Sequence, residues 1–164
     1  MWLALLLLAT ADLTSNKDLL ARARGGDRNA QIEAVLLHRK GAMPELPSQQ
    51  ASLWFRQSLS AKHPAACLEQ AKTLIDMKKN SETLLRCGAA GKLPEAQYLL
   101  GRLILNLTAA EDEQQRFEGL AYLALAAKAG YPPAVRRWDL VAPELSSEDL
   151  GRVEQKSNEF AAVK

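Results

Sequence analysis

The residues that could carry acid–base or metal chemistry are few in this sequence. Its histidines are His38 and His63, and its cysteines are Cys67 and Cys87. These four residues do not form the two spaced ligand pairs of a structural zinc site. We interpret both histidines as polar surface groups, and we expect neither a metal nor a cofactor.

Other patterns that would indicate catalysis are missing as well. Gly25 and Gly26 are not preceded by a strand, so we interpret them as the end of a helix and not as a phosphate-binding loop. No Gly-x-Ser-x-Gly motif is present. Three consecutive acidic residues, Glu111 to Glu113, fall in a polar loop, where we expect a solvated segment and not a catalytic carboxylate pair. We therefore expect no catalytic residues.

The segment between the two cysteines predicts a helical hairpin. It reads as a helix, a turn over residues 78–81, and a second helix capped by Asn80 or Ser81. Folding the chain back at this turn brings Cys67 and Cys87 within about one helical turn of each other. In an oxidising compartment the pair would form a disulfide, and otherwise the two would remain buried free thiols.

The N-terminus decides which compartment to expect. Residues 1–11 read "MWLALLLLATA", an apolar run that ends in the Ala-x-Ala pattern of a cleavable secretory signal. The run is too short to cross a bilayer, which takes about 20 residues. We predict a signal peptide at 1–11 followed by one domain over 12–164. The alternative is an apolar N-terminal helix packed on the core of a cytoplasmic protein.

Composition indicates a helical protein without a nucleic-acid partner. Hydrophobic residues make up 48% of the 164 residues and aromatic residues only 5%, and the apolar set is dominated by Leu and Ala, which favour helices. The net charge is +2, from 21 basic and 19 acidic residues, and no basic run interleaves with aromatic residues. We expect an all-α domain that binds no nucleic acid.

The sequence also repeats itself. When the sequence is aligned with itself, residues 23–35 match residues 89–101. Residues 51–66 match residues 119–134 at an offset that is two residues longer. The matched pairs are Gly25 with Gly91, Ala30 with Ala96, Gln31 with Gln97, Trp54 with Tyr122, Pro64 with Pro132, and Ala66 with Ala134. Each long unit therefore predicts two helices joined by a polar loop.

Helices are also expected outside the two long units. They fall at 16–24, 64–78, 81–90 and 132–141, with a last helix that ends at about residue 160. Proline lacks a backbone N–H, and in the first turn of a helix that N–H would have no partner within the helix. Pro64 and Pro132 therefore suit the first turn of a helix. In total we expect about eight helices as three to four antiparallel pairs, which is an α/α solenoid.

These units resemble the Sel-1-like repeat family, a branch of the tetratricopeptide-like solenoids. The resemblance is carried by "AQYLLG" at 96–101, "GLAYLALAAKAGYPPA" at 119–134 and "ASLWFRQSLSAKHPAA" at 51–66, and it covers most of residues 21–141. It implies adaptor or scaffold work in the bacterial envelope. Small exported Sel-1-like proteins also include immunity proteins that neutralise effectors of the type VI secretion system.

If the function is binding, the candidate residues lie on the solenoid surface. Arginine and tryptophan contribute most to interfaces, and they cluster on the helix after Pro132. The partner-binding candidates are Arg56, Gln97, Arg102, Arg136, Arg137 and Trp138. We expect Gln97 and Arg102 to face a groove, while Trp138 could equally belong to the core.

Together these features predict a non-catalytic, exported protein-binding module. The expected partner is a protein, for example a secreted toxic effector or an envelope complex, and no stable membrane insertion is expected after processing. Two alternatives remain open: a small envelope enzyme acting on the cell wall, and a cytoplasmic regulatory adaptor.

Overall fold

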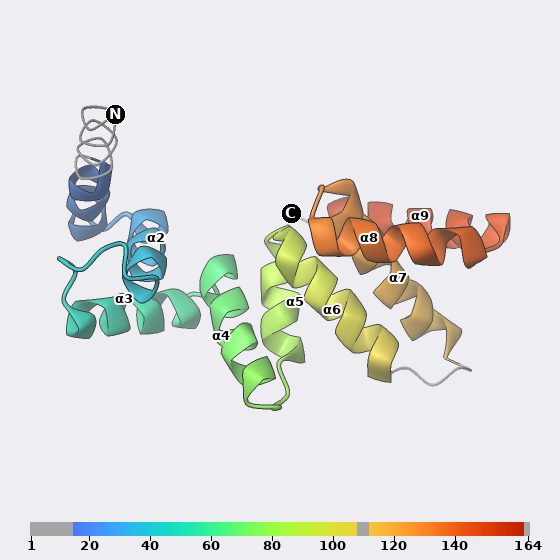
Figure 1. The fold of residues 1–164 in the computed structure, drawn as a ribbon, viewed down its shortest axis with the longest axis horizontal. Helices are drawn as coiled ribbons and strands as arrows, with labels where there is room; N and C mark the ends of the chain where they lie inside the picture. The colour runs from blue at the N-terminus through green and yellow to red at the C-terminus, as the bar shows by residue number, and fades with distance from the viewer. Residues whose placement is uncertain (1–14, 108–111, 163–164) are drawn as a thin grey trace, which may run out of the picture. The chain divides into compact units, whose positions relative to one another are not determined.

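The structure is a computed structural model, and it describes residues 15–107 and 112–162 (Figure 1). In these residues it is all-α, without a strand, as the composition predicts. No helix in the described ranges is long and apolar enough to cross a membrane. The predicted signal peptide at 1–11 lies outside the described residues. The chain divides into two compact units, one ending at Lys62 and one beginning at His63. The single domain expected over 12–164 stays a prediction.

The first unit holds a helical segment over residues 15–24, α2 (Arg28–Arg39) and α3 (Ser48–Ser60). Asp27 caps α2, because its side chain accepts hydrogen bonds from the backbone N–H groups of Asn29 and Ala30. Helices α2 and α3 pack against each other. The core of the unit is mainly apolar and includes Leu19, Leu20, Ile32, Val35, Met43, Leu46, Trp54 and Phe55.

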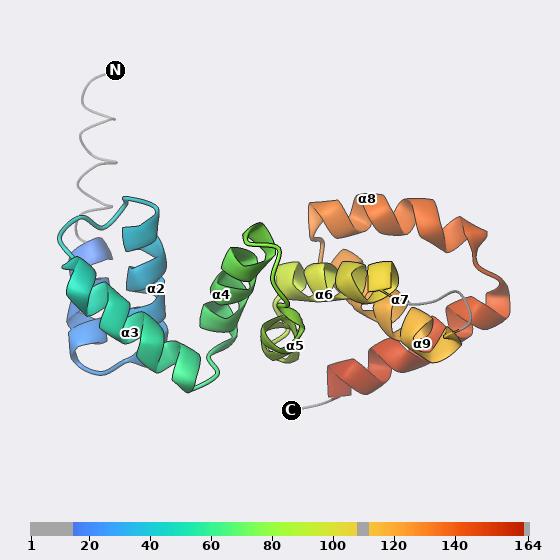
Figure 2. The ribbon, with the colours of Figure 1, turned by 90° about the horizontal axis from the view of Figure 1, so that it is seen from below.

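The second unit holds the remaining helices. In chain order these are α4 (Pro64–Asp76), α5 (Glu82–Ala90), α6 (Pro94–Leu107), α7 (Glu113–Lys128), α8 (Pro132–Val141), the short 3-10 helix η1 (Ala142–Glu144) and α9 (Ser147–Ala162). From α4 to α8 each helix packs on the next, which is the stacking of a solenoid (Figures 1 and 2). The last helix differs, because α9 packs mainly on α7. The predicted starts of α4 and α8 at Pro64 and Pro132 are confirmed.

One turn geometry ends most of these helices. The residue after the helix cap adopts a left-handed conformation, with glycine at Gly26, Gly41 and Gly130 and lysine at Lys62, Lys78 and Lys92. At five of these ends the following N–H donates to a carbonyl five residues back, which satisfies a carbonyl that the helix leaves free. The bonds join Asp27 to Arg22, Ala42 to Leu37, Lys79 to Leu74, Leu93 to Gly88, and Tyr131 to Ala126. The recurring turn is the structural counterpart of the sequence repeat.

A disulfide joins α4 to α5. It links Cys67 to Cys87, whose Cα atoms lie 6.0 Å apart. The turn between the helices is set by Asn80, whose side chain accepts a hydrogen bond from the N–H of Glu82 at 2.9 Å. A bond that closes a loop of this length stabilises the folded protein by about 3 kcal/mol. The helical hairpin inferred from the cysteine spacing is therefore present.

Helices α6 and α7 cross in close backbone contact. A Cβ atom placed on Gly101 would lie 2.7 Å from the carbonyl oxygen of Gly119 and 3.1 Å from the backbone nitrogen of Leu123. A Cβ atom on Gly119 would in turn lie 3.2 Å from the carbonyl oxygen of Gly101. The two backbones therefore touch, and only glycine fits at this crossing.

We predict that Gly101→Ala destabilises the protein, although alanine is the better helix former. The added methyl group meets backbone atoms that cannot rotate away, and such overpacking costs about 1–3 kcal/mol. This exceeds the gain in helix propensity, which is at most about 1 kcal/mol. The free energy of unfolding, measured by urea denaturation, should fall relative to the wild type.

The control for this prediction is Gly151→Ala on α9. No atom lies within 4 Å of a Cβ placed there, so alanine should raise the stability by about 0.5–1 kcal/mol. If Gly101→Ala and Gly151→Ala changed the free energy of unfolding by the same amount, the close contact of α6 with α7 would not restrict the residue at position 101.

Candidate functional site

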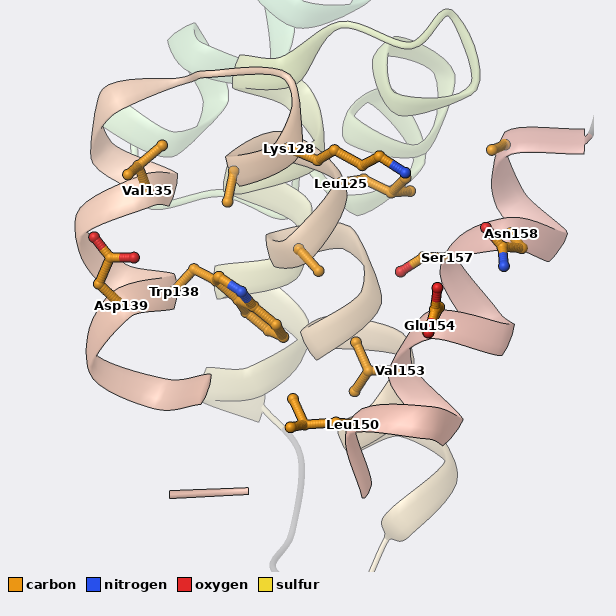
Figure 3. Close-up of a pocket in the computed structure, with 13 residues that line it drawn as sticks. Leu125, Lys128, Val135, Trp138, Asp139, Leu150, Val153, Glu154, Ser157 and Asn158 are labelled. Carbon is orange, nitrogen blue, oxygen red and sulfur yellow. The ribbon is translucent and has the colours of Figure 1, made fainter. Parts of the chain in front are cut away.

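An apolar groove of the second unit lies between α8 and α9, with α7 as its floor (Figure 3). Its volume is about 490 Å³. Figure 3 shows Trp138 reaching from α8 toward Leu150 and Val153 on α9. The groove is lined by Ala124, Leu125, Ala127, Lys128, Val135, Trp138, Asp139, Leu150, Val153, Glu154, Ser157, Asn158 and Ala161.

The groove exists because α8 and α9 both pack on α7. Two contacts hold the middle and the end of α9 there. Ser157 donates a hydrogen bond to the carbonyl of Ala121 at 3.3 Å, and Phe160 stacks on Tyr122 with 4.5 Å between the ring centroids. Arg152 secures the start of α9 through ion pairs with Glu113, on α7, and Glu148.

The base of the groove belongs to the hydrophobic core. Val153 is buried with Phe117 and Leu120, and Trp138 packs against the same cluster while it also lines the groove. Trp138 is half-buried. Its ring is therefore held by the core on one side and contributes apolar surface to the groove on the other.

Charged side chains lie on either side of this apolar surface. Asp139 on α8 and Glu154 on α9 are both exposed, and neither forms an ion pair with a described residue. Lys128, at the end of α7, is the basic residue of the lining. Leu150 adds an exposed apolar side chain, with 37% of its surface accessible. The groove offers an apolar contact surface between unpaired carboxylates.

A second, smaller hollow of about 260 Å³ lies where α6, α7 and α8 meet. It contains two of the predicted residues, Arg102 and Arg137. Its other lining residues are Tyr98, Leu105, Asn106 and Leu123. The guanidinium carbon of Arg102 lies 5.5 Å from the ring centroid of Tyr98, within the range of a cation–π contact.

The three predicted residues of α8 do not form one cluster. Consecutive residues on an α-helix point about 100° apart, so side chains at 136, 137 and 138 diverge. Trp138 faces the core and the groove, Arg137 lines the smaller hollow, and Arg136 is exposed and lines neither. Only Arg137 and Arg102, from separate helices, are brought together.

Two other predicted residues lie elsewhere. Gln97 is buried, with 7% of its surface exposed, so the expectation that it faces a groove is wrong. It stands on the side of α6 that carries the buried Ala96 and Leu100, where a partner could not reach it. Arg56 is exposed on α3 in the first unit, in a hollow that it shares with Arg28 and Gln57.

Helix α9 contributes more to the groove than the sequence predicted. None of the binding candidates chosen from the sequence lies on this helix, yet it supplies Leu150, Val153, Glu154, Ser157 and Ala161 to the groove. These positions follow the spacing of one helix face. The spacing can be read from the sequence, and it predicts that one face of α9 packs on the rest of the protein. It does not show that this face and α8 line the same groove.

Both histidines have structural roles in turns. The carbonyl of Met43 can only accept, so His38 donates to it through Nδ1 at 3.0 Å, which leaves Nε2 to accept from the Ser48 hydroxyl at 3.3 Å. His63 caps α4, since its Nδ1 accepts from the N–H of Ala65 at 3.3 Å. Across the described residues, no group of three or more His, Cys, Asp or Glu side chains is placed to hold a metal ion.

These features define a repeat scaffold, an α/α solenoid with an open groove at its C-terminal end. Among solved structures it is similar to a protective antigen present in uropathogenic Escherichia coli strains, which displays an SLR (Sel-1-like repeat) fold, with a TM-score of 0.62 and 19% sequence identity. The similarity covers 90% of this chain and 32% of the antigen, so the chain spans about a third of the antigen's length. The resemblance to Sel-1-like repeats is thereby confirmed as a fold. No protein-family model and no curated protein matches the sequence.

The capping role of His63 predicts a pH-dependent stability. Burial lowers the pKa of His63 from its ordinary value of 6.5, and a protonated Nδ1 could not accept the hydrogen bond of Ala65. Because the pKa is lower in the folded than in the unfolded chain, the unfolded chain binds the proton first. The contribution of His63 to stability is therefore present above pH 6.5 and is lost as the pH falls below that value.

The variant His63→Asn tests this, because asparagine is a good cap and does not titrate. The free energy of unfolding should be compared at about pH 7.5 and about pH 5 for both proteins. We expect the wild type to lose more stability than the variant over this interval. An equal loss would show that His63 does not cause the dependence.

Proposed function

We propose that this protein is a non-catalytic module that binds a protein partner through the groove between α8 and α9. The observation that carries the proposal is the groove itself, which combines about 490 Å³ of open volume with an apolar lining that includes Trp138. Tryptophan held by a core and exposed on one side is typical of residues that dominate binding energy. Solenoids generally act by presenting such surfaces.

The proposed occupant is a segment of the partner that carries apolar side chains and at least one basic residue. The apolar side chains would cover Trp138, Leu150 and Val153. The basic residue would face Asp139 on α8 or Glu154 on α9. Both carboxylates line the groove, and neither forms an ion pair with a described residue. Charge of this kind orients a partner and speeds its association.

We further propose that the protein is exported and works in the bacterial envelope. Two features support this proposal. The run at residues 1–11 has the pattern of a secretory signal, and the disulfide between Cys67 and Cys87 suits an oxidising compartment. Within the envelope, the resemblance to small exported Sel-1-like proteins favours an immunity protein. Its mechanism would be steric: the bound module covers the active site of a toxic effector.

We predict that Leu150→Gln weakens binding of the cognate partner by about tenfold, since the variant loses an apolar contact and leaves an amide without a hydrogen-bond partner in the interface, which costs about 1–3 kcal/mol. The measurement is the dissociation constant for purified products of the neighbouring genes, obtained by isothermal titration calorimetry. The partner is the product that binds the wild-type protein with a defined stoichiometry.

The matched control is Leu53→Gln. Leu53 is exposed on α3 at 41% of its surface and does not line the groove, so this variant should bind as the wild type does. Thermal unfolding followed by circular dichroism would verify that both variants fold. If the wild type binds and Leu150→Gln binds equally well, the groove is not the interface.

Export makes a separate prediction. When the full-length protein is produced in a bacterial host, mass spectrometry of the purified protein should find the chain starting after Ala11, with one disulfide and no free thiol. An intact Met1 on a protein with two free thiols would contradict export and would favour a cytoplasmic adaptor.

A further inference from the structure

We infer that the hollow between Arg102 and Arg137 binds a carboxylate of the protein partner, the side chain of an aspartate or glutamate. The inference rests on the proposed function, because it takes the ligand to be part of a protein bound on the second unit. It adds a second, acidic recognition element to the apolar segment that the groove accepts. The two arginines come from α6 and α8, and the fold of the second unit brings them together.

The charge of the hollow is not neutralised as it is at two other arginines of this unit. Arg86 pairs with Glu82 and Glu118, and Arg152 pairs with Glu113 and Glu148. Neither arginine of the hollow has such a partner among the described residues, and the lining contains no carboxylate. Within the described residues, the hollow therefore concentrates two positive charges without a paired carboxylate in about 260 Å³.

The geometry of the hollow also suits a carboxylate. Arg102 lies over the ring of Tyr98, which restricts the guanidinium group while its N–H donors stay free for a ligand. Asn106 adds an amide donor at the rim, and Leu105 and Leu123 give the hollow an apolar floor. Two guanidinium groups and an amide around a small space suit one carboxylate, which accepts paired hydrogen bonds from arginine.

The hollow and the groove lie on two sides of the same helix. Helix α8 separates the two hollows, with Val135 and Asp139 on the side of the groove and Arg137 on the side of the smaller hollow. Between these two sides run the exposed Arg136 and Leu140. A partner segment that crosses α8 could place apolar side chains in the groove and an acidic side chain between Arg102 and Arg137.

The test uses a synthetic probe and does not depend on finding the partner. The probe is a short fluorescein-labelled peptide rich in glutamate, and its binding to the full chain is followed by fluorescence anisotropy. We expect the double variant Arg102→Gln, Arg137→Gln to bind the peptide at least about tenfold more weakly than the wild type, because charge-assisted hydrogen bonds are lost. The same peptide with glutamine in place of glutamate should not bind.

The matched control removes the same charge elsewhere. The double variant Arg24→Gln, Arg28→Gln also loses two exposed arginines, neither of which lines the hollow. Its affinity for the acidic peptide should stay within about twofold of the wild type, since exposed charges that do not contact the ligand are largely screened. If the two double variants lost the same affinity for the acidic peptide, the effect would come from net charge alone, and the inference would be wrong.

Two further outcomes would also overturn it. A wild-type protein that does not bind the acidic peptide lacks a carboxylate site, while calorimetric binding of a neighbouring gene product that depends on Leu150 would still support the proposed function. Displacement of the peptide by inorganic phosphate as effectively as by unlabelled acidic peptide would assign the hollow to a free anion. Retention of partial affinity by the variant Arg102→Lys, Arg137→Lys would support the inference, because lysine keeps the charge and loses the paired donors.

Discussion

The backbone contact between Gly101 and Gly119 is the constraint on which the second unit depends. With no side chain at either position, α6 and α7 approach until the carbonyl oxygen of Gly119 leaves no room for a methyl group on Gly101. Helix α7 is thereby fixed against the preceding stack, and it in turn carries α8 on one side and α9 on another. Any residue larger than glycine at this crossing would move the floor of the groove, so binding geometry and packing are coupled here.

Helix α8 is short, and its position gives the unit two surfaces of different character. Toward α9 it faces an apolar groove that has Asp139 and Glu154 beside it, and toward α6 it faces a small hollow with two arginines. Since consecutive helix residues point in different directions, "RRWD" at 136–139 serves both sides of α8 and its outer face. A partner that matches both surfaces would need apolar, basic and acidic side chains in a defined order. Such a requirement yields specificity more readily than area alone.

Much of the fold could be predicted from the sequence because its signals are local. Proline at the first turn, Asn80 and Asp27 as caps, and the left-handed turn residues act within a few positions of one another. The repeat itself predicted the solenoid, since matched helices must bury matched faces against their neighbours. The hairpin around Cys67 and Cys87 followed from one turn between two helices.

What the sequence determined by itself is therefore the helices, their turns and the solenoid class, since these depend on backbone preferences and on periodic apolar residues. Only the tertiary structure decided which residues are available for binding. It buried Gln97 and brought Arg102 beside Arg137 across separate helices. It also placed α9 on α7 so that a groove opened beside Trp138. The physical reason is that exposure and proximity across helices depend on crossing angles and close contacts, which arise from the packing of all helices together and from no local pattern.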